Sequence, residues 1–168
     1  AAFARAYNRW IADFCAADRR RLVPAAVIPM QTVGIALREL ERVSDEGFKV
    51  AMIRPAFQGG RYANHPYYDP LWKAIEERGM LLAVHPYPGT ANPERTSHGP
   101  FVDKMAARAV HDPVGHAIAE VVAPMHDAST FLIAQCWYGF LQRFPELRFT
   151  LLHSKGGWFN LMLEKIEG

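Results

Sequence analysis

Short apolar runs alternate along the chain with segments in which apolar residues recur every three or four positions. Four of the runs predict buried strands, at residues 22–30, 49–54, 80–85 and 148–153. The runs are nearly continuous rather than alternating between apolar and polar, which is typical of parallel strands covered on both faces. The first three predicted strands begin at 22, 49 and 80, which is the spacing of a repeated strand–helix unit.

The helical period predicts helices between these strands. They are expected from residue 3 onward, at 31–46, from 69 to Gly79, in stretches up to about 145 after a loop at 86–100, and from 158 onward. Asp69 is expected to cap the third of them, with Pro70 at its first helical position. An aromatic stripe of Phe3, Tyr7, Trp10 and Phe14 marks the first helix. Both terminal helices are apolar at the very ends of the chain, which suggests a piece of a longer protein.

Two parallel architectures compete for this pattern. A doubly wound nucleotide-binding fold normally carries a glycine-rich turn after a strand, and the chain has neither GxGxxG nor GxxxxGK[ST]. A (β/α)₈ TIM barrel needs no such turn and places its chemistry at the carboxyl ends of the strands. We therefore predict an α/β fold: a partial (β/α)₈ barrel of about four βα units, with residues 1–168 forming one incomplete domain truncated at both ends. Its two open sheet edges require further sequence or another chain.

Composition excludes several other classes of protein. Nineteen basic and seventeen acidic residues give a net charge of +2, too small to suggest binding to nucleic acid or to an anionic membrane. No stretch approaches the roughly 20 apolar residues of a membrane span, and the first residues do not form a signal peptide. Cys15 and Cys136 form no CxxC and are expected to be free buried thiols, which fits a cytoplasmic protein. The basic run Arg19–Arg21 is attributed to the end of the first helix, where the helix dipole favours it.

Two histidines stand where predicted strands end. His85 is followed by Pro86, which stops the strand, and His153 closes the next predicted strand. On neighbouring parallel strands both rings would point into the same barrel mouth, where a neutral histidine can bind zinc and a second can act as an acid or base. The structural alternative is a pair of rim histidines satisfied by backbone carbonyls. The other five histidines, in loops or on helices, are read as surface or capping residues.

Three further residues are candidates for substrate binding. Arg54 ends the second predicted strand and could hold a carboxylate by two hydrogen bonds, although a rim salt bridge explains it equally well. Tyr87 and Trp158 follow the two histidine strand ends, where they could line an aromatic pocket or close the barrel mouth. No aspartate closes a predicted strand, so the sequence shows no candidate for an acidic metal ligand on a barrel strand.

Three blocks of sequence resemble the amidohydrolase-related family, which includes aminocarboxymuconate semialdehyde decarboxylase, resorcylate decarboxylases and related hydrolases. Residues 139–148 with His153 and Gly156–Gly157 resemble its G-x-F-x-R-F-P-x-L-R…H-x-G-G region. Residues 66–72 with Val84–Pro86 resemble its D-P-x-x-x-P-L-W…V-H-P block, and 21–29 resemble its opening R-(F/L)-x-x-x-A-x-x-P. The tandem of V-H-P and R-F-P-x-L-R…H is the specific part, and the match spans nearly the whole chain.

The resemblance implies a (β/α)₈ barrel holding one divalent metal, zinc or sometimes manganese. It implies that His85 is the metal ligand of barrel strand five, and that His153, on strand six, contacts the metal-bound water and serves in acid–base chemistry. The family's first-strand His-x-His or Glu-x-His and its eighth-strand Asp do not occur here, so the four strands would be barrel strands three to six. Ser154-Lys155 departs from the glycine-rich turn often found there.

The implied activity is hydrolysis or non-oxidative decarboxylation of a small carboxylated or cyclic organic molecule. We expect the full-length parent to be an enzyme and this chain alone to bind metal weakly and lack turnover, because the ligand set is incomplete. The parent's expected partner is its small-molecule substrate, and a homo-oligomer is left open. The alternative is a catalytically inactive half-barrel relative with a structural or interaction role.

Overall fold

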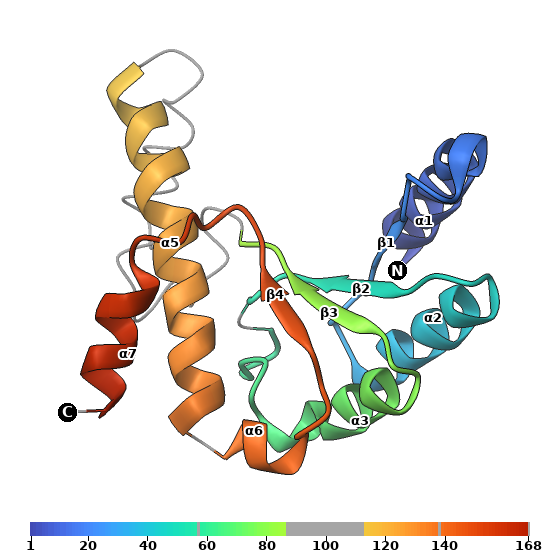
Figure 1. Cartoon of the computed structure of the whole chain (residues 1–168). Helices are drawn as coiled ribbons and strands as arrows, with labels where there is room; N and C mark the ends of the chain where they lie inside the picture. The colour runs from blue at the N-terminus through green and yellow to red at the C-terminus, as the bar shows by residue number, and fades with distance from the viewer. Residues whose placement is uncertain (57, 87–112, 138, 168) are drawn as a thin grey trace. The chain divides into compact units, whose positions relative to one another are not determined.

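One parallel sheet organises the described part of the chain. The computed structural model describes residues 1–56, 58–86, 113–137 and 139–167 (Figure 1). Within them the sheet contains β1 (Ala25–Val27), β2 (Val50–Ile53), β3 (Leu81–Val84) and β4 (Phe149–Leu151), in that order. Parallel pairing places Ala26 beside Ala51 and Ala51 beside Leu82. All four predicted strands are present, and the predicted parallel α/β class is confirmed.

The order of the strands follows the chain without a reversal. A doubly wound sheet changes direction at its switch point, whereas a barrel adds each strand to the same side of the last. Because β–α–β crossovers are right-handed, a strand order that never reverses keeps the connecting helices on one face of the sheet. The observed order is therefore that of an arc of a barrel.

The helices fall where the periodicity predicted them. They are α1 (Ala2–Cys15), α2 (Val33–Asp45), α3 (Asp69–Glu77), α5 (Pro113–Trp137), α6 (Phe140–Arg143) and α7 (Phe159–Glu167), with short 3₁₀ helices η1 (Ala16–Asp18) and η2 (Pro66–Tyr68). The strands are shorter than their apolar runs. Pro24 and Pro29 flank β1 and cannot donate to the ladder, so the run at 22–30 yields only three strand residues.

The chain divides into two compact units. The first unit comprises residues 1–53, 64–84 and 141–150, and the second comprises 54–63, 85–140 and 151–168. The first unit carries most of the sheet, and its core packs helix side chains such as Leu40 and Trp72 with strand residues such as Leu82, all fully buried. Among the helices described, none is both long enough and apolar enough to cross a bilayer. Cys15 and Cys136 are free, as predicted; Cys15 is buried and Cys136 only partly so.

The predicted helix cap at Asp69 is wrong. Asp69 is the first residue of α3, the residue before it is Tyr68, and no side chain caps that end of the helix. The Asp69 carboxylate instead forms an ion pair with Arg143, whose Nε lies 3.2 Å from Oδ2. Because η2 runs directly into α3, Asp69 is already helical and its side chain is available to a residue 74 positions along the chain. A side-chain cap does occur at the start of α2, where Thr32 accepts from the Ile35 amide.

The aromatic stripe of α1 is not its buried face. Phe3 is 94% exposed, and Trp10 and Phe14 are each 57% exposed. The buried positions are Ala4, Asn8 and Cys15, which share another side of the same helix. The stripe correctly predicted the helix, but the side that packs against the sheet is the one bearing small residues and a polar amide.

The Asn8 side chain closes the outer edge of β1. Its Oδ1 accepts from the Val27 amide at 2.7 Å, and its Nδ2 donates to the Val27 carbonyl at 3.0 Å. On the other side of β1, the Ile28 amide donates to the Met52 carbonyl of β2. The backbone amide and carbonyl of Val27 therefore point away from β2. One side-chain amide thus makes the two hydrogen bonds that a neighbouring strand would make at this residue.

A buried carboxylate holds Asn8 in place. Glu39 on α2 is 3% exposed; its Oε1 accepts from Asn8 Nδ2 at 2.9 Å and from Arg42 at 2.6 Å, and Arg5 lies 3.4 Å from Oε2. Burial by itself raises the pKa of Glu39, but the hydrogen bonds from Arg42 and Asn8 and the positive charge of Arg42 outweigh it. The pKa is therefore lowered below the ordinary value.

Acid should weaken the first unit through Glu39. A carboxylate whose pKa is depressed in the folded state stabilises that state above its unfolded pKa, and this contribution is lost as pH falls through the folded pKa. Glu39→Gln is expected to lower the free energy of unfolding by about 1–2 kcal/mol at pH 7. The difference between this variant and the unsubstituted chain should shrink between pH 5 and pH 3. Urea unfolding at pH 7, 5 and 3 measures this. Glu41→Gln, an exposed neighbour, is the control, and a Glu39→Gln deficit that does not change with pH would contradict the assignment.

Candidate functional site

His85 follows directly on β3. The strand ends at Val84, and Pro86 stops the ladder immediately afterwards. The His85 Nδ1 lies 2.7 Å from the Pro86 carbonyl oxygen. A carbonyl can only accept, so in the neutral ring this contact selects the tautomer with the proton on Nδ1 and the lone pair on Nε2. A metal-binding histidine is typically fixed by this kind of backbone contact to its other nitrogen.

His153 is brought against His85. The two rings stack with centroids 5.6 Å apart and planes inclined by 17°. Both histidines belong to the second unit, so the pairing lies within one compact body. The sequence placed His153 at a strand end, which is wrong by two residues: β4 ends at Leu151, and His153 lies in the bend that follows. There its backbone has a φ of 54°, in the left-handed region.

The turn after β4 is held by Trp158. Its indole N–H donates to the carbonyl of Ser154 at 2.8 Å and to that of Lys155 at 3.1 Å. The ring is 8% exposed. These contacts bind the start of α7 to the bend that carries His153, so the structural work of Trp158 is to fix this turn. Because the indole N–H is occupied by the backbone, any contact with a substrate would come from the ring itself.

The same turn gives a physical reason for glycine at the position of Lys155. Lys155 has a φ of 54°, a conformation that glycine adopts without cost and other residues at roughly 1–2 kcal/mol. Lys155 is exposed, so its side chain has little packing to lose. The departure from the glycine-rich pattern therefore places a strained residue beside the site.

Lys155→Gly is expected to stabilise the protein. Relief of the left-handed strain exceeds the extra chain entropy of glycine, and we expect a net gain of about 0.5–1 kcal/mol in the free energy of unfolding. Thermal or urea unfolding measures it. Lys165→Gly, an exposed position inside α7, should instead lose about 1 kcal/mol. If both substitutions destabilise equally, the turn stores no strain at Lys155.

The remaining sequence candidates are placed as follows. Arg54 directly follows β2 and is exposed. It belongs to the second unit, as do both histidines. Tyr87 lies outside the described residues. His65, one of the histidines read as a capping residue, does cap η2, because its Nδ1 accepts from the Tyr67 amide at 3.1 Å.

Buried polar side chains that the sequence analysis did not single out occur on α5 and in the loop after β2. Asp127 and Gln135 are both fully buried on α5. The Tyr62 hydroxyl and both polar atoms of the Gln135 side chain are buried without a hydrogen-bond partner. Burial, with the nearby charge of Asp127, raises the pKa of Tyr62 well above its ordinary value, so this phenol stays protonated. The sequence signal for Asp127 and Gln135 would have been a polar residue on the buried side of a predicted helix. Periodicity identifies such a residue only when the buried side is already known.

The described residues fit one ligand of a divalent metal rather than a whole site. His85 presents Nε2 with its lone pair, which suits zinc or manganese. No group of three or more histidine, cysteine, aspartate or glutamate side chains suited to holding a metal occurs within the described residues. Because imidazole lone pairs lie in the ring plane, two stacked rings do not direct them at one point between the planes. The pair therefore suits one metal ligand beside one proton-transfer group better than two ligands of the same ion.

Comparison with known proteins gives the class. The family model described as Amidohydrolase matches residues 1–167, so the chain belongs to the amidohydrolase family. Gamma-resorcylate decarboxylase from Polaromonas sp. (strain JS666) is 34% identical to it over 89 residues, which are 49% of this chain and 27% of that enzyme.

Solved structures confirm the fold. An amidohydrolase from Mycobacterium avium subsp. paratuberculosis K-10 superimposes with a TM-score of 0.73 at 19% identity, covering 98% of this chain and 40% of that one. A dihydroxybenzoic acid decarboxylase from Polaromonas sp. JS666, solved with bound manganese and the inhibitor 2-nitroresorcinol, superimposes with a TM-score of 0.61 at 22% identity, covering 87% and 42%. The chain thus has the fold of part of a TIM-barrel amidohydrolase and spans less than half the length of these relatives.

Proposed function

We infer that the whole protein is a metal-dependent decarboxylase of small hydroxylated aromatic acids, and that this chain supplies one metal ligand and the proton-transfer group. The observation that carries the proposal is the stacked pair of His85 and His153 in a chain of the amidohydrolase family. The similarity to gamma-resorcylate decarboxylase favours loss of carbon dioxide over hydrolysis. The manganese in a structural relative supports a divalent ion.

His85 would hold the metal through Nε2. Its Nδ1–H is committed to the Pro86 carbonyl, which fixes both the tautomer and the direction of the ring. When bound, the metal would stabilise the negative charge of the substrate's oxygens. Zinc and manganese both accept imidazole nitrogen, and we propose zinc with manganese as the alternative.

His153 would move the proton. His153 is an exposed residue in the bend after β4, and its ring stacks on that of His85, so it stands beside the proposed metal ligand. In decarboxylation a protonated His153 would give its proton to the ring carbon that bears the carboxylate. The bond from that carbon to the carboxylate then breaks, its electron pair returns to the aromatic ring, and carbon dioxide leaves.

The three remaining candidates would contact the substrate rather than change it. Arg54 has the donor geometry to hold a carboxylate by two hydrogen bonds, and the Trp158 ring is fixed at the same turn as His153. Tyr87 is proposed as a third substrate contact from its position in the sequence alone, directly after Pro86.

The test is product formation by the whole protein after its metal has been removed and restored. With 2,6-dihydroxybenzoate we expect resorcinol and carbon dioxide in equal amounts once zinc or manganese is added, and no product in the chelated protein. The 168-residue chain assayed alone should be inactive. Turnover that survives chelation, or turnover confined to esters and amides, would overturn the proposal. Correct folding of an inactive whole protein with both histidines in place would favour the non-catalytic relative.

A further inference from the structure

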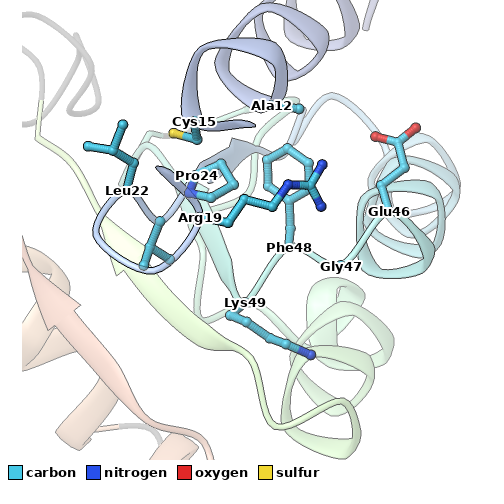
Figure 2. A pocket seen from close by; sticks show the side chains of 10 residues that line it. Ala12, Cys15, Arg19, Leu22, Pro24, Glu46, Gly47, Phe48 and Lys49 are labelled. Atoms are coloured by element: carbon cyan, nitrogen blue, oxygen red, sulfur yellow. The ribbon is translucent and has the colours of Figure 1, made fainter. Parts of the chain in front are cut away.

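A pocket of about 160 Å³ lies in the first unit, at the amino ends of β1 and β2. Its wall is built by the end of α1 with the residues after it, by the connection into β1, and by the turn between α2 and β2 (Figure 2). His85 and His153, in contrast, follow the carboxyl ends of β3 and β4. The pocket is therefore built from segments that contribute nothing to the candidate catalytic site.

The inner wall of the pocket is apolar. Phe48 is 2% exposed and Cys15 is 5% exposed, and Ala12, Leu22 and Pro24 complete this side. A dry cavity of about 150 Å³ with an apolar lining accommodates a benzene-sized molecule. The volume here is thus sufficient for one six-membered ring or a branched aliphatic group of similar size.

Two basic side chains without an ion-pair partner among the described residues line the pocket beside this apolar wall. Arg19 and Lys49 both line the pocket, and neither makes an ion pair or side-chain hydrogen bond in the part of the chain that the structure describes. The acidic neighbours are already engaged: Glu46 pairs with Arg42, and Asp18 lies 3.9 Å from Arg20. Two unneutralised positive charges therefore remain beside an apolar wall.

We propose that this pocket binds a small organic monoanion, a carboxylate carried on one ring-sized apolar group. The ring would occupy the space against Phe48 and Ala12, where burial of apolar surface provides the affinity. The carboxylate would lie at the rim, where the planar guanidinium of Arg19 can donate two hydrogen bonds to it. Lys49 lines the pocket from the strand side but its ammonium points away from Arg19 (Figure 2), so Arg19 is the cation that would meet the carboxylate. This assignment gives Arg19 of the basic run a role beyond a favourable interaction with the helix dipole, and it is independent of the proposed catalysis.

Benzoate is a suitable probe, because it has the ring and the charge but lacks the hydroxyl groups of the proposed substrates. Titration of the whole protein, followed through the backbone amide NMR signals of the pocket residues, reports the location as well as the affinity. We expect saturable shifts at Gly47, Phe48 and Lys49 with a dissociation constant on the order of 1 mM. Benzyl alcohol, with the same ring and no charge, and inorganic phosphate, with charge and no ring, should each bind about tenfold more weakly or not at all.

Three substitutions separate the pocket from general anion binding. Arg19→Gln should weaken benzoate binding about tenfold, whereas Arg20→Gln, which removes an adjacent cation that does not line the pocket, should change it less than about twofold. Ala12→Leu keeps both cations and fills the cavity, so it should abolish the shifts. The proposal is overturned if benzoate causes no saturable shift at Gly47–Lys49, if phosphate or benzyl alcohol binds as well as benzoate, or if Arg20→Gln weakens binding as much as Arg19→Gln.

Discussion

His85→Ala is expected to strip the divalent metal from the whole protein, whereas His153→Ala should leave the metal in place and abolish turnover. We expect the alanine at His85 to lower metal affinity by at least about 100-fold, because a direct ligand matters more than the supporting residues whose loss costs 10–100-fold. The alanine at His153 should lower the turnover number by about 10²–10⁴-fold, the usual contribution of a general acid or base.

The two outcomes follow from the geometry of the pair. His85 has its Nδ1 at the Pro86 carbonyl, so in the neutral ring the lone pair is on Nε2 and is available to a metal. The His153 ring stacks nearly parallel to the His85 ring. The in-plane lone pairs of the two rings are therefore not directed at one metal position. Metal content after gel filtration and turnover with saturating substrate measure the two effects separately.

His65→Asn is the matched control for these substitutions. His65 is an exposed histidine that caps η2 through the Tyr67 amide, and asparagine can retain that cap. It should change neither metal content nor turnover by more than about twofold. Equal loss of metal from His85→Ala and His153→Ala would mean that both rings are ligands, and the division of roles proposed for them would be wrong.

Asn8→Ala is expected to cost about 2–4 kcal/mol of unfolding free energy. The substitution removes three hydrogen bonds and leaves the Val27 amide and carbonyl at the sheet edge without partners. It also takes a donor from the buried carboxylate of Glu39. Urea unfolding at neutral pH measures the loss, and Asn160→Ala, an exposed asparagine on α7, should stay within about 0.5 kcal/mol of the parent chain.

Asn8→Asp distinguishes hydrogen bonding from shape. Aspartate has nearly the same shape as asparagine and can still accept from the Val27 amide, but it cannot donate to the Val27 carbonyl or to Glu39. It also brings a second negative charge to within hydrogen-bond distance of a buried carboxylate. We therefore expect a loss at least as large as that of Asn8→Ala. A stable Asn8→Asp protein would show that side-chain volume, and not the donated hydrogen bonds, keeps this edge closed.

The fold was predictable because its signals are local. Each strand is a short apolar run bounded by turn residues, and the βα spacing alone suggested the parallel order that the structure has. Boundaries were less predictable because proline and backbone bends override hydrophobicity. Pro24 shortens β1, and the bend at His153 ends β4 two residues early. Asp69 was assigned to a cap because Asp-Pro is a frequent helix start. In the structure η2 runs directly into α3, so Asp69 is already helical and does not cap the helix.

The candidate site was predictable only in part. The two histidines could be paired from strand order, and the structure does bring their rings together. Asn8 and Asp127 could not be found in this way, because each is a polar residue on the buried side of a helix and the sequence does not say which side is buried. In α1 the aromatic stripe identified the helix but not its buried face, because the stripe is largely exposed. The fit of the Val27 backbone to a side-chain amide is a tertiary contact with no local signature.

The left-handed turn after β4 offers a way to read evolutionary pressure on this chain. His153 and Lys155 share the same φ of 54°, so the backbone alone would favour glycine or asparagine equally at both. In a saturation library sorted only for folded protein, both positions should drift toward those two residues. In a library selected for turnover, only position 155 should drift toward glycine or asparagine. Retention of histidine at position 153 would then show that turnover selects for it despite the strained backbone. Position 155, which has the same φ, serves as the internal reference.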